Sequence, residues 1–306
     1  MKKKPNPGAY GASGLGRISS WKTRIFNGAR LIFQFPPFEK TLRLLTRGRR
    51  PGHPFCKLAP NCYQYPRGTL RTIQHNGLIF KVDLGDYVGN GIYFGFLDFE
   101  IRALLKLCQR DSVVLDIGAN IGWTALNLAR IAQNGKIFAF EPDEASMASL
   151  RANIALNHAA NIQPCPYGLG DQNRDLYLET RETSNAGMNR ICPRKSKGGR
   201  PTQVVRLDDF QPTATLNRLD LVKIDVEGFE LKVLRGGQRL IRMTMPSLFI
   251  EIDDANLQDH GDSAAALIHF LGELGYRKIL RADSGQEVRP DHEFSGQHFD
   301  ILATKT

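Results

Sequence analysis

The sequence lacks any long apolar run. No stretch of the 306 residues approaches the roughly 18 consecutive apolar residues of a membrane-spanning helix. The opening residues, MKKKPNPGAYGASGLGR, also lack the apolar segment that a secretory signal needs. We therefore expect a cytoplasmic location, with peripheral attachment to a membrane as the alternative.

Cysteine is scarce and scattered along the chain. The five cysteines are odd in number and include no CxxC pair, which favours a reducing compartment over a disulfide framework. A zinc site built from Cys56 and Cys62 with His53 and His75 would match no common ligand spacing. No metal is expected.

Acidic residues are almost absent from the first 50 positions, which hold twelve Lys or Arg and a single acid, Glu39. The net charge of +10 therefore belongs mainly to this arm, and it indicates a local anionic contact rather than a domain that binds nucleic acid. A stripe of apolar residues in the arm has helical spacing. We prefer packing of this stripe on the protein's own core, and contact with an anionic membrane surface is the alternative. The stripe consists of Ile18, Trp21, Ile25, Ala29 and Ile32.

The chain divides into three predicted segments. Residues 1–67 form a basic, partly disordered extension with one or two helices, where Pro36 and Pro37 end the first helix. A short second helix then carries Phe38, Leu42 and Leu45. Residues 68–110 form an accessory hairpin and helix, with strands across 68–92 and a tight turn at Asn76-Gly77. Residues 111–306 form the main domain.

Short apolar strands alternate with helical patterns through the main domain. This alternation predicts a parallel sheet covered by helices, because strands buried on both faces appear as continuous apolar runs. Two late strands, 276–280 and 299–303, are expected at an edge. The four predicted parallel strands are Val113–Ile117, Ile137–Phe140, Leu221–Ile224 and Leu248–Glu251.

A glycine turn follows the first of these strands. Gly118, Asn120 and Gly122 separate the strand from a helix that starts near Trp123, which is the arrangement of a nucleotide-binding unit. A dinucleotide-binding turn would have a third glycine at position 123, and Trp123 argues against it. Glu141, at the end of the second strand, is suited to accept hydrogen bonds from both hydroxyls of a ribose.

Five sequence blocks, in order, resemble the FkbM family of methyltransferases: VVLDIGANIGWTALNLA, KIFAFEPDEASMASLRANIALN, VVRLDDF, LVKIDVEGFELKVLRGG and LFIEID. The resemblance covers roughly residues 93–280. It implies an α/β class I methyltransferase fold, a Rossmann-like, mostly parallel seven-stranded sheet with an antiparallel edge strand and helices on both faces. It also implies S-adenosylmethionine as the cofactor.

The resemblance further implies how the cofactor is held. Asp116, Gly118, Asn120 and Gly122 would line its methionine part, and Glu141 would bind its ribose. Asp171 corresponds to a position that can contact the adenine amine. Capping of the following turn is an equal alternative for Asp171.

Acidic residues also lie at the ends of the last two of these strands. Asp225 and Glu227 follow Leu221–Ile224, which is expected beside Val113–Ile117, where an acceptor hydroxyl would need a base. The alternative for Asp225 is the N-cap of the next helix, and the alternative for Glu227 is a carboxylate in the first turn of that helix. Glu251 is expected to orient the acceptor or to pair with a basic residue. The basic segment 184–200 is interpreted as a loop that is either solvated or covers the acceptor.

The leading functional hypothesis is therefore O-methylation of a hydroxyl on a glycan, glycolipid or secondary metabolite. The expected partners are a small-molecule, glycan or lipid-linked acceptor, with no nucleic acid. The alternatives are an N-methyltransferase, a nucleic-acid methyltransferase, or a non-catalytic membrane-associated binding protein of the same fold.

Overall fold

The computed structural model describes residues 27–28, 30–49, 52–99, 101–179, 189–193 and 198–305. The chain forms two compact units. The first unit comprises the described residues up to Ile73 together with Lys81–Ile101. The second comprises Gln74–Phe80 and the chain from Arg102 onward.

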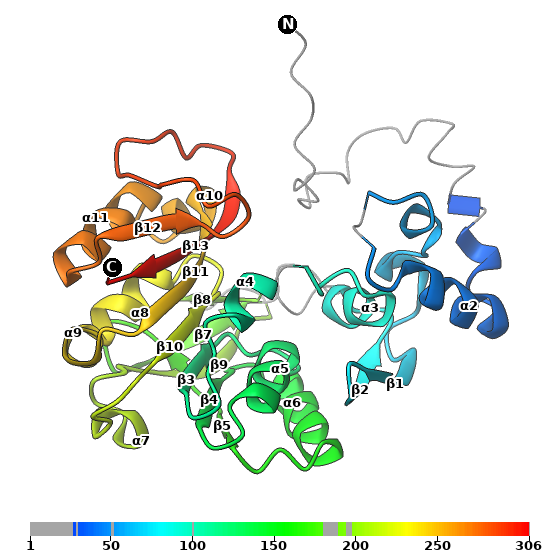
Figure 1. The fold of residues 1–306 in the computed structure, drawn as a ribbon, viewed down its shortest axis with the longest axis horizontal. Helices are drawn as coiled ribbons and strands as arrows, with labels where there is room; N and C mark the ends of the chain where they lie inside the picture. The colour runs from blue at the N-terminus through cyan, green and yellow to red at the C-terminus, as the bar shows by residue number, and fades with distance from the viewer. Residues whose placement is uncertain are drawn as a thin grey trace, which may run out of the picture. The chain divides into compact units, whose positions relative to one another are not determined.

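The first unit contains the predicted second helix, α2 (Pro36–Thr46; blue in Figure 1). Pro36 and Pro37 occupy the first turn of α2, where a missing backbone N–H costs nothing, so they begin this helix. Most of the predicted apolar stripe lies outside the described residues. Its last member, Ile32, is 59% exposed, and the packing preferred for this position is therefore wrong.

Glu39 is the one acid of the first 50 residues, and it is buried within this unit. Its carboxylate accepts hydrogen bonds from the hydroxyls of Tyr65, at 3.2 Å, and Tyr93, at 2.8 Å. Arg71 adds an ion pair at 2.9 Å. This carboxylate is satisfied internally, so it does not offset the positive charge of the surface.

A hairpin of β1 (Leu70–His75) and β2 (Leu78–Asp83) confirms the predicted turn at Asn76-Gly77. The predicted strand over 87–92 is wrong, because α3 (Tyr87–Phe94) occupies this segment. Asp86 caps α3 by accepting from the backbone N–H groups of Val88 and Gly89. A cap at this position starts a helix where the apolar residues alone are ambiguous.

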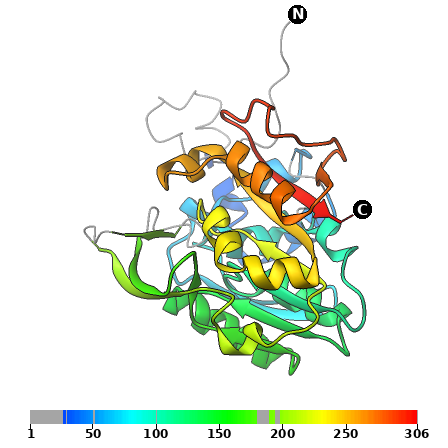
Figure 2. The same cartoon turned by 90° about the vertical axis from the view of Figure 1, so that its left-hand side faces the viewer.

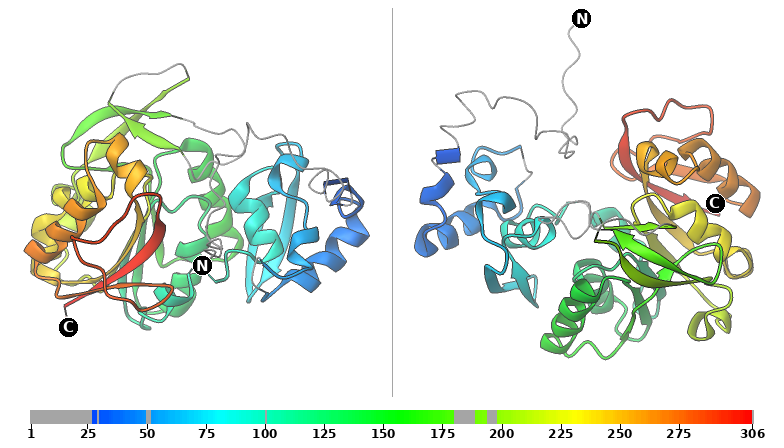
Figure 3. Two further views of the ribbon diagram at one scale, coloured as in Figure 1. Left: turned by 90° about the horizontal axis from the view of Figure 1, so that it is seen from above. Right: turned by 180° about the vertical axis from the view of Figure 1, so that it is seen from behind.

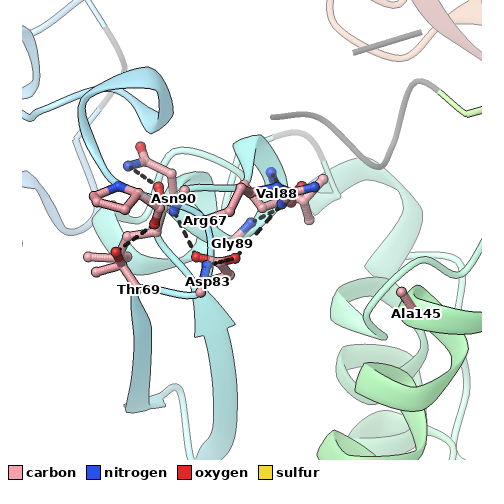
Figure 4. Close-up of polar contacts among 12 residues, drawn as sticks. Arg67, Thr69, Asp83, Val88, Gly89, Asn90 and Ala145 are labelled. Atoms are coloured by element: carbon pink, nitrogen blue, oxygen red, sulfur yellow. Dashed lines mark hydrogen bonds and ion pairs between the residues drawn. The ribbon is translucent and has the colours of Figure 1, made fainter. Parts of the chain in front are cut away.

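The start of α3 is held by polar contacts within the first unit (Figure 4). Arg67 donates to the Asp86 carboxylate at 2.9 Å, and Asp83 accepts from the backbone of Gly68 at 2.7 Å. Gly89 packs so closely on Asp83 that a Cβ atom would collide with the Asp83 carbonyl oxygen. Glycine is therefore required at this position by space alone.

The second unit is built on a seven-stranded sheet in the order β12-β13-β11-β10-β3-β4-β5 (Figure 1). In this sheet β13 runs antiparallel to both of its neighbours, β11 and β12, and the remaining strand pairs are parallel. The predicted class I methyltransferase fold is confirmed by this order. The strands are β3 (Val113–Ile117), β4 (Lys136–Phe140), β5 (Ile162–Cys165), β10 (Leu221–Ile224), β11 (Ser247–Asp253), β12 (Lys278–Arg281) and β13 (His298–Thr304).

Helices cover both faces of this sheet (Figures 1 and 2). On one face, α5 (Trp123–Ile131) and α6 (Glu144–Leu156) pack beside β4 and β5. On the other, α11 (Ala264–Leu274) packs on α8 (Glu230–Gly236) and α9 (Gln238–Thr244) over one continuous apolar core. The remaining described α-helices are short: α4 (Arg102–Leu105), α7 (Gln211–Ala214) and α10 (Asp254–Asp259).

A second sheet of four strands, β6-β9-β7-β8, belongs to the same unit (Figures 2 and 3). Part of the segment 184–200, predicted as a loop, forms β8 (Arg190–Cys192), which pairs with β7 (Arg174–Glu179). Residues 180–188 and 194–197 of this region lie outside the described residues. The other two strands are β6 (Gly168–Leu169) and β9 (Arg200–Val205).

None of the described helices is both long enough and apolar enough to span a bilayer.

Candidate functional site

The glycine turn after β3 is packed tightly against the neighbouring strands. The backbone N–H groups of Gly118 and Ala119 both donate to the carbonyl oxygen of Phe140, at the end of β4. Gly118 has φ +81°, and a Cβ atom there would collide with the carbonyl oxygen of Asp225. Glycine is needed here both for its left-handed conformation and for the close approach. Gly122 (φ +92°) begins α5 and packs on Leu150.

Asp116 lies in β3 just before this turn and is fully buried. Neither of its carboxylate oxygens has a hydrogen-bond partner of ordinary geometry among the described residues. The nearest cation is the Lys223 Nζ atom, 3.6 Å from Asp116 Oδ1. Burial raises the pKa of Asp116 despite this ammonium. A buried carboxylate of this kind is costly unless a ligand satisfies it.

Glu141 follows β4 and is also buried. Its two oxygens accept from the backbone N–H groups of Asn120, at 2.9 Å, and Asp143, at 2.8 Å. Burial raises the pKa of Glu141 to about 7. Each carboxylate oxygen keeps a lone pair for another donor, so the side chain can hold a hydroxyl-bearing ligand as well as the turn.

Lys223 contacts both the glycine turn after β3 and Asp225 after β10. Its ammonium donates to the Gly118 carbonyl oxygen at 2.8 Å and lies 3.2 Å from Asp225 Oδ2. Burial lowers the pKa of Lys223. The negative charges of Asp225 and Asp116 together raise this pKa by more than burial lowers it, so the net shift is upward. The sequence analysis missed this residue. Its position two residues before Asp225, on the same face of β10, was the available signal.

Asp225, Glu227 and Glu251 converge at the carboxyl end of β10 and β11. Side-chain oxygens from all three lie within 4.8 Å of one another. Burial, and then the charge of Asp225, raises the pKa of Glu227 to about 8, and the same two causes raise that of Glu251. Glu227 also accepts from the Asn256 amide at 2.7 Å. The cluster therefore holds at least one proton near neutral pH.

His298, at the start of β13, is a second residue that sequence reasoning missed. Its ring nitrogens lie 3.1 Å from Glu251 and 3.4 Å from Asp253. Hydrogen bonds to Asp253 and Glu251 raise the pKa of His298 to about 11, so the imidazole is protonated. Glu251 thus pairs with a basic residue, which is one of the two roles expected for it. Three carboxylates so close could hold a divalent cation, but Lys223 and His298 already supply positive charge to two of them.

The N-cap alternative for Asp225 and the first-turn alternative for Glu227 are both wrong. Helix α8 begins at Glu230 and its N-cap residue is Phe229. Glu230 itself accepts from the backbone N–H groups of Val226, at 3.2 Å, and Gly228, at 3.0 Å. The two acids are therefore left available for another role.

Asp171 does not contact these carboxylates among the described contacts. It follows β6, is partly exposed, and has its carboxylate 4.0 Å from Arg174. It makes no described contact with Asp116, Glu141 or Asp225. The structure therefore brings together the other predicted site residues, around Lys223 and the glycine turn, and leaves Asp171 at a separate strand end.

The strand order and this site agree with what sequence comparison finds. The profile of the methyltransferase FkbM domain matches residues 116–278, more than half of the chain. The chain belongs to the FkbM family. The match includes the glycine turn, Glu141 and the three acids Asp225, Glu227 and Glu251.

Curated relatives of this FkbM chain include several methyltransferases. "Methyltransferase 1" of Beauveria bassiana is 32% identical over 41% of this chain and 58% of its own length. The "Hexuronic acid methyltransferase AglP" of Haloferax volcanii is 29% identical over 44% and 54%. The "2-O-methyltransferase NoeI" of Sinorhizobium fredii is 28% identical over 58% and 74%. The chain thus spans just over half the length of the first two relatives.

A solved FkbM methyltransferase from Methylobacillus flagellatus is also similar. It shares 17% identity, with 71% of this chain and 52% of its own chain covered, and the TM-score is 0.39. The assignment of the fold depends on the strand order and not on this likeness.

Proposed function

We propose that the chain is an S-adenosylmethionine-dependent methyltransferase that methylates a hydroxyl of a glycan, glycolipid or secondary metabolite. The observation that carries the proposal is the position of Lys223, which contacts both the glycine turn after β3 and the carboxylate cluster after β10. A site for a methyl donor and a site for a proton acceptor are therefore adjacent at the carboxyl edge of the sheet, where ligands of such folds bind.

The donor half fits a ligand with an amino acid moiety and a ribose. Asp116 is a buried carboxylate without a hydrogen-bond partner among the described residues. The Asn120 side-chain oxygen is likewise buried and has no hydrogen-bond partner among these residues. These atoms, with the close turn at Gly118 and Gly122, are proposed to hold the methionine part. Glu141 is proposed to accept from the ribose hydroxyls. Asp171 is proposed, on the family resemblance alone, to contact the adenine amine.

The acceptor half supplies a proton acceptor beside the transfer path. S-adenosylmethionine, when bound, supplies an electrophilic methyl group on a sulfonium. Asp225 is proposed to take the proton of the acceptor hydroxyl at a carboxylate oxygen, since Lys223 stabilises its negative charge. Glu227 is proposed to receive this proton in turn. Glu251, held by His298, is proposed to orient the acceptor.

Two relatives bear on the class of acceptor. One is named as a methyltransferase of a hexuronic acid and another as a 2-O-methyltransferase. Both names support a hydroxyl-rich acceptor for this chain. A carboxylate cluster is also suited to such an acceptor, because ionised and protonated carboxyl groups together offer both acceptors and donors to neighbouring hydroxyls.

The proposal is tested by transfer of a labelled methyl group from S-adenosylmethionine to fractionated glycans, lipids and small metabolites. We expect label in a fraction whose product is a methyl ether, and loss of labelling in Asp225→Asn. Label in a methylamine or in nucleic acid would transfer the assignment to those alternative classes. Absence of S-adenosylhomocysteine binding in calorimetry at millimolar ligand would overturn the enzyme proposal.

A further inference from the structure

Large apolar side chains are exposed together on α2 and on residues 31–35 before it. Leu31, Ile32, Phe35 and Phe38 are 54%, 59%, 59% and 49% exposed, and we call them the Phe35 surface. The rings of Phe35 and Phe38 lie 5.8 Å apart between centroids. With Leu44 and Leu45, this one segment holds half of the exposed large apolar residues of the described chain. Single exposed apolar residues are ordinary, but such a concentration marks a contact surface.

The opposite side of α2 accounts for the folding of this helix. Leu42 and Thr46 are buried, together with the Glu39 carboxylate and its tyrosine and arginine partners. The Phe35 surface therefore does not contribute to the core of the unit, and its exposure is not needed to form α2.

The charge around this surface is of one sign. Residues 27–67 contain eight Lys or Arg and one acid, Glu39. Because Glu39 is buried and satisfied internally, the charge presented to solvent is positive. Lys40 and Arg47, both exposed, lie on α2 and directly after it.

We propose that the Phe35 surface binds the interface of an anionic lipid bilayer. Aromatic and aliphatic side chains enter the boundary between headgroups and acyl chains, while the flanking cations meet anionic headgroups. A second copy of the chain fits this surface poorly, because it would bring two sets of like charges together. The proposal concerns the first unit alone and is independent of the methyltransferase activity.

Vesicle flotation of the full chain tests this inference. Vesicles of phosphatidylcholine alone are compared with vesicles that also contain phosphatidylglycerol. We expect the chain to float with the anionic vesicles and to remain unbound with the neutral ones. Phe35→Ser/Phe38→Ser should reduce partitioning at least about tenfold, because it removes two aromatic anchors. Lys40→Glu/Arg47→Glu should reduce it by at least roughly tenfold, at about fivefold per cation removed.

The matched control is Leu156→Ser/Met243→Ser, which removes two exposed apolar residues elsewhere in the chain. It should float like the parent chain. Equal flotation of Phe35→Ser/Phe38→Ser and the parent would overturn the proposal, as would equal binding to neutral and anionic vesicles. A parent chain that sediments as a dimer, and becomes monomeric in Phe35→Ser/Phe38→Ser without any flotation, would assign the surface to self-association instead. Circular dichroism of each variant confirms that it is folded.

Discussion

The ammonium of Lys223 lies 3.2 Å from the carboxylate of Asp225, two residues further along the chain. This pair lies at the carboxyl end of β10, where β10 pairs with β3. Because the same ammonium also donates to the Gly118 carbonyl oxygen, the charge of Lys223 connects the proposed donor and acceptor halves.

Lys223→Met should destabilise the chain by about 3 kcal/mol. The substitution leaves Asp116 buried without its nearest cation, and the loss is at the low end for breaking a buried ion pair because Asp225 is 42% exposed. The measurement is chemical denaturation. Lys278→Met, on an exposed position of β12, is the control and should change stability by less than about 0.5 kcal/mol. Equal effects of the two substitutions would contradict the role of Lys223.

Asp116→Asn should separate stability from ligand binding. Burial raises the pKa of Asp116, so the ionised carboxylate costs folding free energy that a neutral amide does not. We expect unchanged or increased stability together with at least about tenfold weaker binding of S-adenosylhomocysteine, since the loss of a charge-assisted hydrogen bond is worth roughly that factor. Calorimetry and denaturation measure the two quantities. Normal binding by this variant would refute the assignment of Asp116 to the donor.

Gly118→Ala and Gly77→Ala form a matched pair, because both glycines have φ +81°. A Cβ atom at Gly77 meets nothing within 4 Å, whereas one at Gly118 collides with the Asp225 carbonyl oxygen. Both variants should lose the roughly 1–2 kcal/mol that a left-handed conformation costs a non-glycine residue. Only Gly118→Ala should also weaken binding of S-adenosylhomocysteine. Equal binding of S-adenosylhomocysteine by both variants would show that the turn tolerates displacement.

Binding of the donor should depend on pH through Glu141. Its pKa is raised to about 7, and the ionised form is the better acceptor for two ribose hydroxyls. Affinity for S-adenosylhomocysteine should therefore increase as the pH rises through about 7. The contribution of this group to folding runs the opposite way, because a raised carboxyl pKa gives stability at low pH that is lost as the pH rises through about 7. Glu141→Gln should remove both dependences, and a persistent pH dependence of binding would assign it elsewhere.

The rate of methyl transfer should depend on Glu227. Its pKa is raised to about 8, and a protonated carboxyl group cannot receive a proton. We expect kcat/KM to increase as the pH rises through about 8 in the parent chain. Glu227→Gln should lower kcat/KM and flatten this limb without changing the binding of S-adenosylhomocysteine. An unchanged profile in Glu227→Gln would exclude this residue from the proton path.

Much of the fold was predictable from local pattern. The runs Val113–Ile117 and Leu221–Ile224 have the bounds that were predicted, because strands covered on both faces must be apolar throughout. The segment 87–92 was misassigned because a short apolar run suits a helix as well as a strand. The N-cap formed by the Asp86 side chain and the close packing of Gly89 on Asp83 stabilise the helical conformation of this segment, α3.

The candidate site was predictable only in part. Carboxylates that follow parallel strands share one edge of the sheet, so the proximity of Asp116, Glu141 and Asp225 follows from strand order. Lys223 faces Asp116 because β10 and β3 pair in a register that aligns these two residues. His298 faces Asp253 for the same reason, across an antiparallel pair far apart in sequence.

The sequence by itself determined which strands are buried, where the glycine turn lies, and that acids follow three strands, since each depends on residue type within a few positions. The tertiary structure decided which charges meet, that Glu39 is buried while Phe35 and Phe38 are exposed, and which carboxyl groups have raised pKa values. These properties depend on distance and on removal from water. Both are set by packing between segments that are distant along the chain.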